Sequence, residues 1–176
     1  IITLMLNKLH KAGRPIPDRE IFEFIQDKVS ESYAYLYERD LHPLFLEKFK
    51  IWIQGSVNNG ILGLNEFKEL TYTHGTSQSF DCFYFKHNKK RLRILRGDFL
   101  YHKLCSEKYI DFKWLEDGKL EKGDCMIISV PFSDSGNIPY GLDSILNECD
   151  KKDIPVWIDA AYMVMASGIF IDLNHK

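Results

Sequence analysis

The stretch Ile154–Tyr162, which reads IPVWIDAAY, places one carboxylate, Asp159, after an apolar run. The run is typical of a buried parallel strand, because such strands are covered on both faces and carry few polar side chains. A carboxylate in that environment is costly unless it has a partner. Ligands of open α/β sheets bind at the carboxyl ends of the strands, so Asp159 is expected to face a ligand.

The chain has 176 residues, enough for one domain with a core of its own. Its formal net charge of −2 argues against a nucleic-acid binder dominated by basic side chains. No apolar run reaches the length of a membrane span and no signal-peptide pattern is present, so we expect no membrane partner. The four cysteines are widely spaced without a CxxC motif, which indicates reduced thiols in a cytoplasmic protein. Because the chain starts at Ile1 rather than Met, we expect an excerpt of a longer protein.

Residues 1–63 are predicted to form an N-terminal helical segment. Apolar residues recur with helical spacing over residues 18–29 and again over residues 43–53, where a proline stands at the start. Ser56–Gly63 is rich in glycine and asparagine, which indicates a turn.

Residues 64–176 alternate between strand-like and helix-like patterns. Such alternation implies βαβ units and a largely parallel sheet, and therefore an α/β fold. The expected strands are Glu69–Thr73, Leu92–Leu95, Cys125–Val130 and Pro155–Asp159, the expected helices are Gln78–His87, Tyr101–Lys108 and Tyr140–Lys151, and Tyr109–Leu115 fits a strand or a loop.

The turn Gly75-Thr76-Ser77 lies between a predicted strand and a predicted helix. Glycine permits a tight turn, and the free N–H groups of a helix N-terminus bind phosphate well. Thr76 and Ser77 add hydroxyl donors. The alternative is that these hydroxyl residues are ordinary helix N-caps.

Further candidate residues follow the predicted strands at three places. Phe99 and Tyr101 follow one strand and would stack on a planar ligand, or else pack as core aromatics. The polar loop Pro131–Gly136, PFSDSG, follows the next strand and would border the ligand, or else serve as a plain connection. Tyr162 stands three residues after Asp159, where the chain leaves its strand, and both could face the ligand. The alternatives are that Asp159 is a helix N-cap and that Tyr162 is a packing residue.

The remaining polar residues give weaker signals. The histidines lack metal-ligand spacing; His74 and His102 lie near proposed sites, but either could be a satisfied surface residue. The basic run over residues 86–93 is expected to be a solvated helix end and strand edge rather than a nucleic-acid patch.

The order of these features resembles the fold-type I enzymes that use pyridoxal 5′-phosphate (PLP), especially class I/II aminotransferases. The matching residues are Gly75-Thr76-Ser77, Phe99, Ser133–Gly136 and Asp159-Ala160-Ala161-Tyr162. The resemblance covers roughly Leu44–Lys176 and implies a three-layer αβα fold with a mostly parallel sheet. Residues 64–176 would be part of the PLP-binding large domain.

The resemblance also implies a role for each matching residue. Asp159 would pair with the protonated pyridine nitrogen of PLP, which favours the charged form of both groups. Tyr162 would hydrogen-bond the phenolic oxygen of the cofactor. Phe99, with Tyr101 as the second candidate, would stack on the ring. The phosphate would be held by Gly75, Thr76 and Ser77.

The chain departs from the family pattern at two places. Class I/II aminotransferases usually carry Asn-Pro-x-Gly after the middle strand, whereas this loop reads Ser133-Asp134-Ser135-Gly136. Ser133 stands where the asparagine is expected, unless Asn137 takes its place. The Schiff-base lysine is expected beyond this chain, since we predict no further strand between Asp159 and Lys176.

The leading hypothesis is therefore a PLP-dependent aminotransferase that moves an amino group between an amino acid and a keto acid and works as a homodimer. The aromatic N-terminal residues fit a subunit interface or a core of their own. Alternatives are a lyase or decarboxylase on the same fold and a non-catalytic binding or interaction protein. A nucleotide-binding doubly wound domain would require a G-x-G-x-x-G turn, which the sequence lacks.

Overall fold

The computed structural model describes residues 18–26 and 41–173 and divides the chain into two units, Ile1–Pro43 and Leu44–Lys176. In the first unit, residues 19–26 are helical. Asp18 caps this helix, because its Oδ1 accepts the backbone N–H of Ile21 at 3.1 Å. The expected continuation to Val29 lies outside the described residues.

The second helical pattern is confirmed by helix α3 (Leu41–Gly55). After it the structure departs from the expected helical segment over residues 1–63, because Asn59–Leu62 form strand β1. This strand pairs in parallel with β6 (Ile169–Asp172), far along the chain. A short 3-10 helix, η1 (Leu64–Glu66), follows β1.

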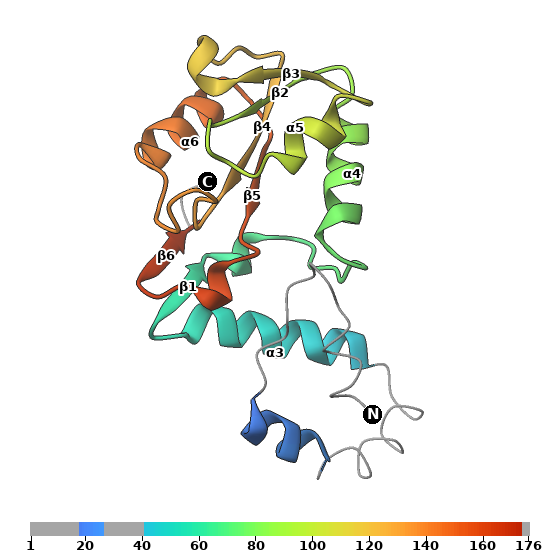
Figure 1. The fold of residues 1–176 in the computed structure, drawn as a ribbon, viewed down its shortest axis with the longest axis vertical. Helices are drawn as coiled ribbons and strands as arrows, with labels where there is room; N and C mark the ends of the chain where they lie inside the picture. Colours follow the sequence, from blue (N-terminus) through green and yellow to red (C-terminus); the bar gives the residue numbers. More distant parts are fainter. Residues whose placement is uncertain (1–17, 27–40, 174–176) are drawn as a thin grey trace. The chain divides into compact units, whose positions relative to one another are not determined.

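A four-stranded sheet forms the centre of the second unit (Figure 1). Its strand order is β3-β2-β4-β5, and every pairing is parallel. The α/β class with parallel sheets is therefore confirmed. The strands are β2 (Arg91–Ile94), β3 (Asp111–Trp114), β4 (Asp124–Ser129) and β5 (Val156–Asp159).

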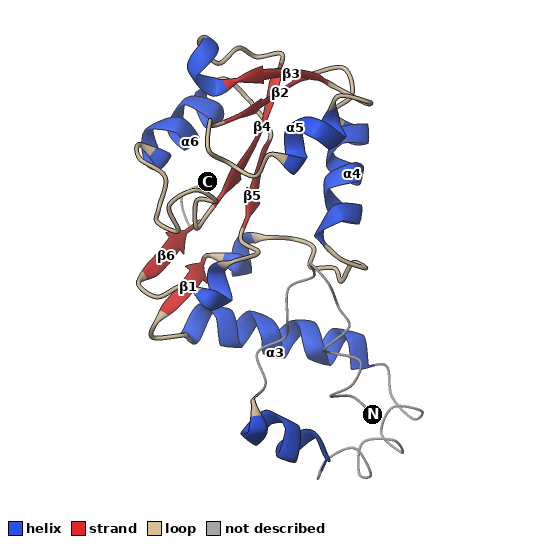
Figure 2. Ribbon diagram, in the orientation of Figure 1, coloured by secondary structure: helices blue, strands red, loops and turns tan. Residues whose placement is uncertain are grey.

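Helices cover both faces of this sheet (Figure 2). Helices α4 (Thr76–Lys86) and α5 (Tyr101–Ser106) lie on one side and α6 (Leu142–Lys151) on the other. The side chains of β4 alternate between two apolar clusters: Cys125 and Ile127 face α4, whereas the cluster on the α6 side includes Met126 and Ile128. The arrangement is compatible with a three-layer αβα fold.

Two predictions about strands were wrong. Glu69–Thr73 forms no strand, and most of its side chains are exposed, so its weak alternation has no apolar face to bury. The expectation that no strand follows Asp159 is also wrong, since β6 lies between Asp159 and Lys176. Two further 3-10 helices, η2 (Leu115–Asp117) and η3 (Met163–Met165), connect the strands.

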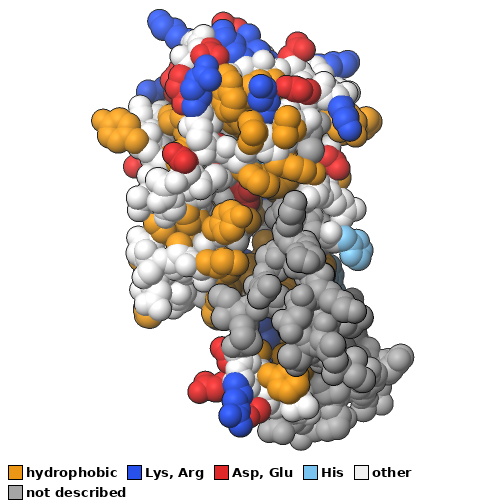
Figure 3. All heavy atoms as spheres, viewed as in Figure 1, with side chains coloured by type: hydrophobic (Ala, Val, Ile, Leu, Met, Phe, Trp, Pro, Cys, Tyr) orange, Lys and Arg blue, Asp and Glu red, His pale blue; other side chains and the backbone are white. Residues whose placement is uncertain are grey.

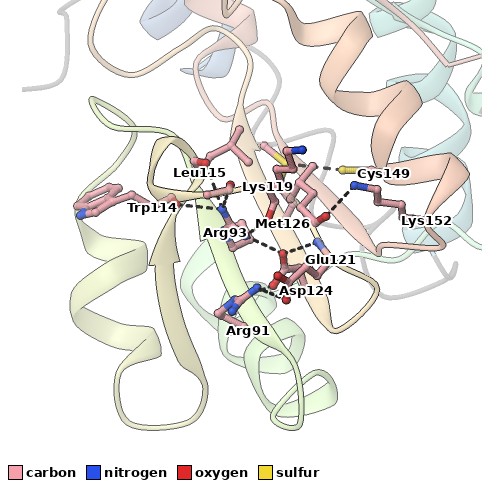
Figure 4. A network of polar contacts seen from close by, with 12 residues as sticks. Arg91, Arg93, Trp114, Leu115, Lys119, Glu121, Asp124, Met126, Cys149 and Lys152 are labelled. Carbon is pink, nitrogen blue, oxygen red and sulfur yellow. Dashed lines mark hydrogen bonds and ion pairs between the residues drawn. The ribbon is translucent and has the colours of Figure 1, made fainter.

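A buried ion pair joins β2 to β4 (Figure 4). Arg93 Nη1 donates to Asp124 Oδ2 at 2.8 Å, and both side chains are fully buried. Arg91 Nε adds a bond of 2.7 Å to Asp124 Oδ1. The prediction of a solvated basic run is thus wrong at Arg93, because its neighbours in the sheet and the loop before β4 enclose it.

The Arg93 guanidinium also holds the loop between β3 and β4. Its nitrogens donate to four backbone carbonyls, one at the end of β3 and three in that loop. Burial alone would raise the pKa of Asp124, but the hydrogen bonds from Arg91 and the Glu121 N–H and the charge of Arg93 lower it. Asp124 therefore stays ionised inside the sheet. The four carbonyls belong to Trp114, Leu115, Gly118 and Lys119.

The surface of this unit is mixed. Figure 3 shows exposed hydrophobic side chains on the drawn face and charged side chains gathered toward the end of the sheet where β4 begins. Phe45 and Trp52 of α3 are about half exposed, whereas Tyr33, Tyr35 and Tyr37 lie outside the described residues. Within the described ranges, no helix has the length and hydrophobicity needed to span a bilayer.

We expect the substitution Arg93→Met to destabilise the protein by about 3–5 kcal/mol, because it removes the fully buried partner of Asp124 and the donor to four backbone carbonyls. Arg96→Met is the matched control, since Arg96 pairs with Asp117 at the surface and should contribute about 1 kcal/mol or less. Urea unfolding measures both free energies. Equal effects of the two substitutions would contradict the assigned role of Arg93.

Candidate functional site

The candidate site lies where β2, β4 and β5 end. Ser129, the last residue of β4, is in register with Asp159, the last residue of β5. The Val130 N–H continues the ladder by donating to the Asp159 carbonyl at 2.9 Å. Parallel pairing thus brings the residues after each strand to one edge, as the sequence predicts for Asp159.

The Asp159 side chain is 10% exposed, and its two oxygens have different environments. Oδ1 accepts the Ala161 N–H at 3.0 Å, so the acid caps the turn that follows β5. Oδ2 lies 3.9 Å from His102 Nε2, too far for a hydrogen bond. Burial raises the pKa of Asp159, and the Asp98 charge raises it further against the effect of the Ala161 bond. A cation beside Oδ2 would relieve this cost.

His102, on α5, is fully buried rather than a surface histidine. Its Nδ1 lies 2.8 Å from the hydroxyl of Tyr84 on α4. Its Nε2 has no hydrogen-bond partner among the described residues. Burial lowers the pKa of His102 to about 4, although the Asp98 carboxylate opposes the shift. The imidazole is therefore neutral near pH 7 and presents an unpaired polar atom toward Asp159.

Asp98 ties the loops at this edge together. Its Oδ1 accepts the Phe99 N–H at 2.7 Å and the Ser133 hydroxyl at 3.1 Å. Its Oδ2 accepts the Ser129 N–H at 2.9 Å. One nearly buried carboxylate thus links the end of β2, the end of β4 and the loop that carries Ser133.

Gly97 allows the β2 loop to approach the β4 loop. Its φ of 86° lies in the left-handed region, where side chains are rarely tolerated. A Cβ on Gly97 would also stand 3.2 Å from the Asp134 Cβ and 3.3 Å from the Phe132 ring. Glycine is required here on both grounds.

Ser133 and Tyr162 line one pocket of about 280 Å³. Tyr162 is half exposed, and Ser133 is exposed apart from its bond to Asp98. The structure therefore brings these two predicted residues to the same hollow. The other lining residues are Pro131, Phe132, Gly136, Met165 and Ala166.

The predicted phosphate turn stands at the start of α4. Gly75 is the N-cap, with a φ of 105°, and no side chain caps the helix. The alternative that Thr76 or Ser77 is an N-cap is therefore wrong, since both lie inside the first turn, where they are exposed. The first N–H groups of an uncapped helix favour an anion.

Phe80, one turn after Thr76 on α4, contacts residues near Asp159. The Phe80 ring packs edge-on against His102 at 4.6 Å and against Trp157 of β5 at 5.8 Å. In Figure 1, α4 begins at the end of the sheet where β4 and β5 stop. Within the described residues, however, no hydrogen bond joins Gly75, Thr76 or Ser77 to Asp159.

The two predicted stacking residues stack on each other. The rings of Phe99 and Tyr101 are 5.5 Å apart and inclined by 18°. Phe99 also meets His102 edge-on at 5.6 Å and remains 43% exposed, whereas Tyr101 packs partly against the α4 side of the core. Phe99 therefore has the freer ring face of the two.

Nothing in the sequence placed Tyr84 or Asp98 at the site, and the sequence did not decide whether His102 is a site residue or a surface residue. Tyr84 occupies a core position of an amphipathic helix, and nothing in its spacing distinguishes it from packing residues. Asp98 follows the Gly97 turn after β2, which is the same signal that drew attention to Asp159. The described part of the chain holds no group of His, Cys, Asp or Glu suited to a metal ion.

We expect Asp98→Ala to lower the free energy of unfolding by about 1–3 kcal/mol, because it leaves the buried Ser129 N–H unpaired. Asp134→Ala in the adjacent loop is the matched control, because Asp134 is exposed, and should change stability little. A double-mutant cycle with Ser133→Ala, followed by urea unfolding, isolates the Asp98–Ser133 term. Additive effects in that cycle would contradict the link between the two loops.

Comparisons with protein-family models, with curated proteins and with solved structures give no match to this chain. Any function for the chain therefore depends on the site itself.

Proposed function

We propose that this chain is part of a PLP-dependent aminotransferase of the class I/II family, with the cofactor at the edge formed by β2, β4 and β5. The observation that carries the proposal is the Asp159 carboxylate. One of its oxygens is unpaired within the described residues and lies beside the unpaired Nε2 of buried His102. A protonated ring nitrogen is a donor and a cation that this oxygen would accept.

The other matching residues support the same cofactor. The N–H groups of Thr76 and Ser77, at the uncapped start of α4, would hold the phosphate. The exposed face of Phe99 would cover the ring, with Tyr101 behind it. Ser133 and Tyr162 share one pocket and would approach the phenolic oxygen.

PLP, when bound, supplies an electron sink that stabilises the carbanion formed when a bond to the substrate Cα breaks. The chain's own contribution is electrostatic. Asp159 would keep the proton on the ring nitrogen, because a buried carboxylate stabilises an adjacent cation. Phe99 would exclude water from one face of the ring. We assign no Schiff-base lysine within residues 18–26 and 41–173.

The proposal includes the family's finer architecture. Residues 64–176 would belong to a three-layer αβα large domain, and the substrates would be an amino acid and a keto acid. The exposed aromatic residues of α3, Phe45 and Trp52, suit a homodimer interface. The thiols of Cys82 and Cys125, which form no disulfide within the described residues, suit a cytoplasmic protein.

A second candidate is a non-catalytic binding protein on the same fold. It is favoured by Ser133, which stands where the family has an asparagine and whose hydroxyl donates to Asp98 instead of facing a ligand. The products formed from an amino-acid panel with PLP separate the candidates. A keto acid indicates an aminotransferase, carbon dioxide a decarboxylase, and no product the binding protein.

We expect the chain to bind PLP and Asp159→Asn to weaken that binding about 10- to 100-fold, because it removes a charge-assisted hydrogen bond. Equilibrium dialysis measures the affinity. Asp150→Asn is the matched control, since Asp150 is exposed on α6, and it should leave the affinity unchanged.

Two results would overturn the proposal. The first is the absence of PLP binding to the unaltered chain. The second is equal affinity of the Asp159→Asn and Asp150→Asn variants. Pyridoxal without its phosphate serves as a further probe, and it should bind more weakly than PLP if the start of α4 holds the phosphate.

A further inference from the structure

Tyr84 makes a buried contact that the proposed function leaves unused. Its hydroxyl lies 2.8 Å from His102 Nδ1, and both side chains are fully buried. The two residues come from different helices, α4 and α5. This contact therefore fixes the imidazole of His102 from the side opposite to Asp159.

A neutral imidazole carries one proton, on either Nδ1 or Nε2. If Nδ1 carried it, the lone pair of Nε2 would face Asp159 Oδ2 across 3.9 Å, and two electron-rich atoms would oppose each other. If the Tyr84 hydroxyl donates to Nδ1, the proton sits on Nε2 and points toward that carboxylate. Asp159 is the carboxylate that lies beside Nε2 and favours a proton on that atom, and the Asp98 charge acts on the same ring.

We propose that Tyr84 is a positioning residue whose hydroxyl donates to His102 Nδ1 and holds His102 as the Nε2–H tautomer aimed at Asp159. The tautomer is a property of the protein without any cofactor. Its consequence, which is to keep Asp159 ionised and oriented toward a ring nitrogen, rests on the proposed function.

Packing keeps the imidazole in the plane that this contact requires. The Phe80 ring meets it at 86° and the Phe99 ring at 90°, so two aromatic rings pack nearly perpendicular to it. A turned imidazole would lose the Tyr84 bond and disturb this packing. His102 therefore has a fixed orientation as well as a fixed tautomer.

The experiment is ¹⁵N NMR of histidine-labelled protein near pH 7, well above the His102 pKa of about 4, so that the ring is neutral. We expect the unaltered protein to show a protonated Nε2 and an unprotonated Nδ1 at His102. Tyr84→Phe, which removes only the hydroxyl, should shift His102 toward a mixture of tautomers. Tyr140→Phe, at a fully exposed tyrosine, should not.

A protonated Nδ1 at His102 in the unaltered protein would overturn the proposal even if the variant failed to fold. So would an unchanged tautomer in folded Tyr84→Phe. In parallel, Tyr84→Phe should weaken PLP binding about 2- to 10-fold, because a mixture of His102 tautomers no longer holds Asp159 in one charged orientation. If the tautomer is as proposed but PLP does not bind, Tyr84 keeps its role at His102 and the cofactor assignment fails.

Discussion

The ion pair between Arg93 and Asp124 is the interaction on which the sheet depends. It fixes β2 against β4 at the end where β4 begins, inside a strand that is buried along its whole length. The pairing of β2 with β4 keeps one register along both strands, so their carboxyl ends lie side by side. There the Asp98 carboxylate accepts the Ser129 N–H. The ion pair at the end where β4 begins thus fixes the strand register that brings the residues of the candidate site together at the carboxyl end.

At the carboxyl end of the sheet, polar groups are buried without a full set of hydrogen-bond partners. Among the described residues, His102 Nε2 and the Ser129 hydroxyl are buried without a hydrogen-bond partner. Of the two Asp159 oxygens, Oδ1 accepts the Ala161 N–H, whereas Oδ2 lies 3.9 Å from His102 Nε2. Buried groups of this kind are rare and costly where they serve only stability. The proposed cofactor site rests on these groups and on the uncapped start of α4.

Much of the sheet could be predicted from local pattern. The strand ending at Ser129 is a continuous apolar run, and Asp159 follows another, so the edge itself was predictable. Pairing between β1 and β6 was not, because it joins segments more than a hundred residues apart and leaves little trace in either. The burial of Arg93 was hidden for the same reason: its partners are carbonyls of a loop that the sequence does not place. His102 gave no signal beyond its proximity to Phe99.

The central claim is that Asp159 holds a proton on a pyridine nitrogen. The most direct measurement is the ¹⁵N chemical shift of ring-labelled PLP bound to the chain, compared between the unaltered protein and Asp159→Asn. We expect a protonated ring nitrogen in the unaltered protein and an unprotonated one in the variant. A bound cofactor whose ring nitrogen is unprotonated in the unaltered protein, or equally protonated in both, would contradict it.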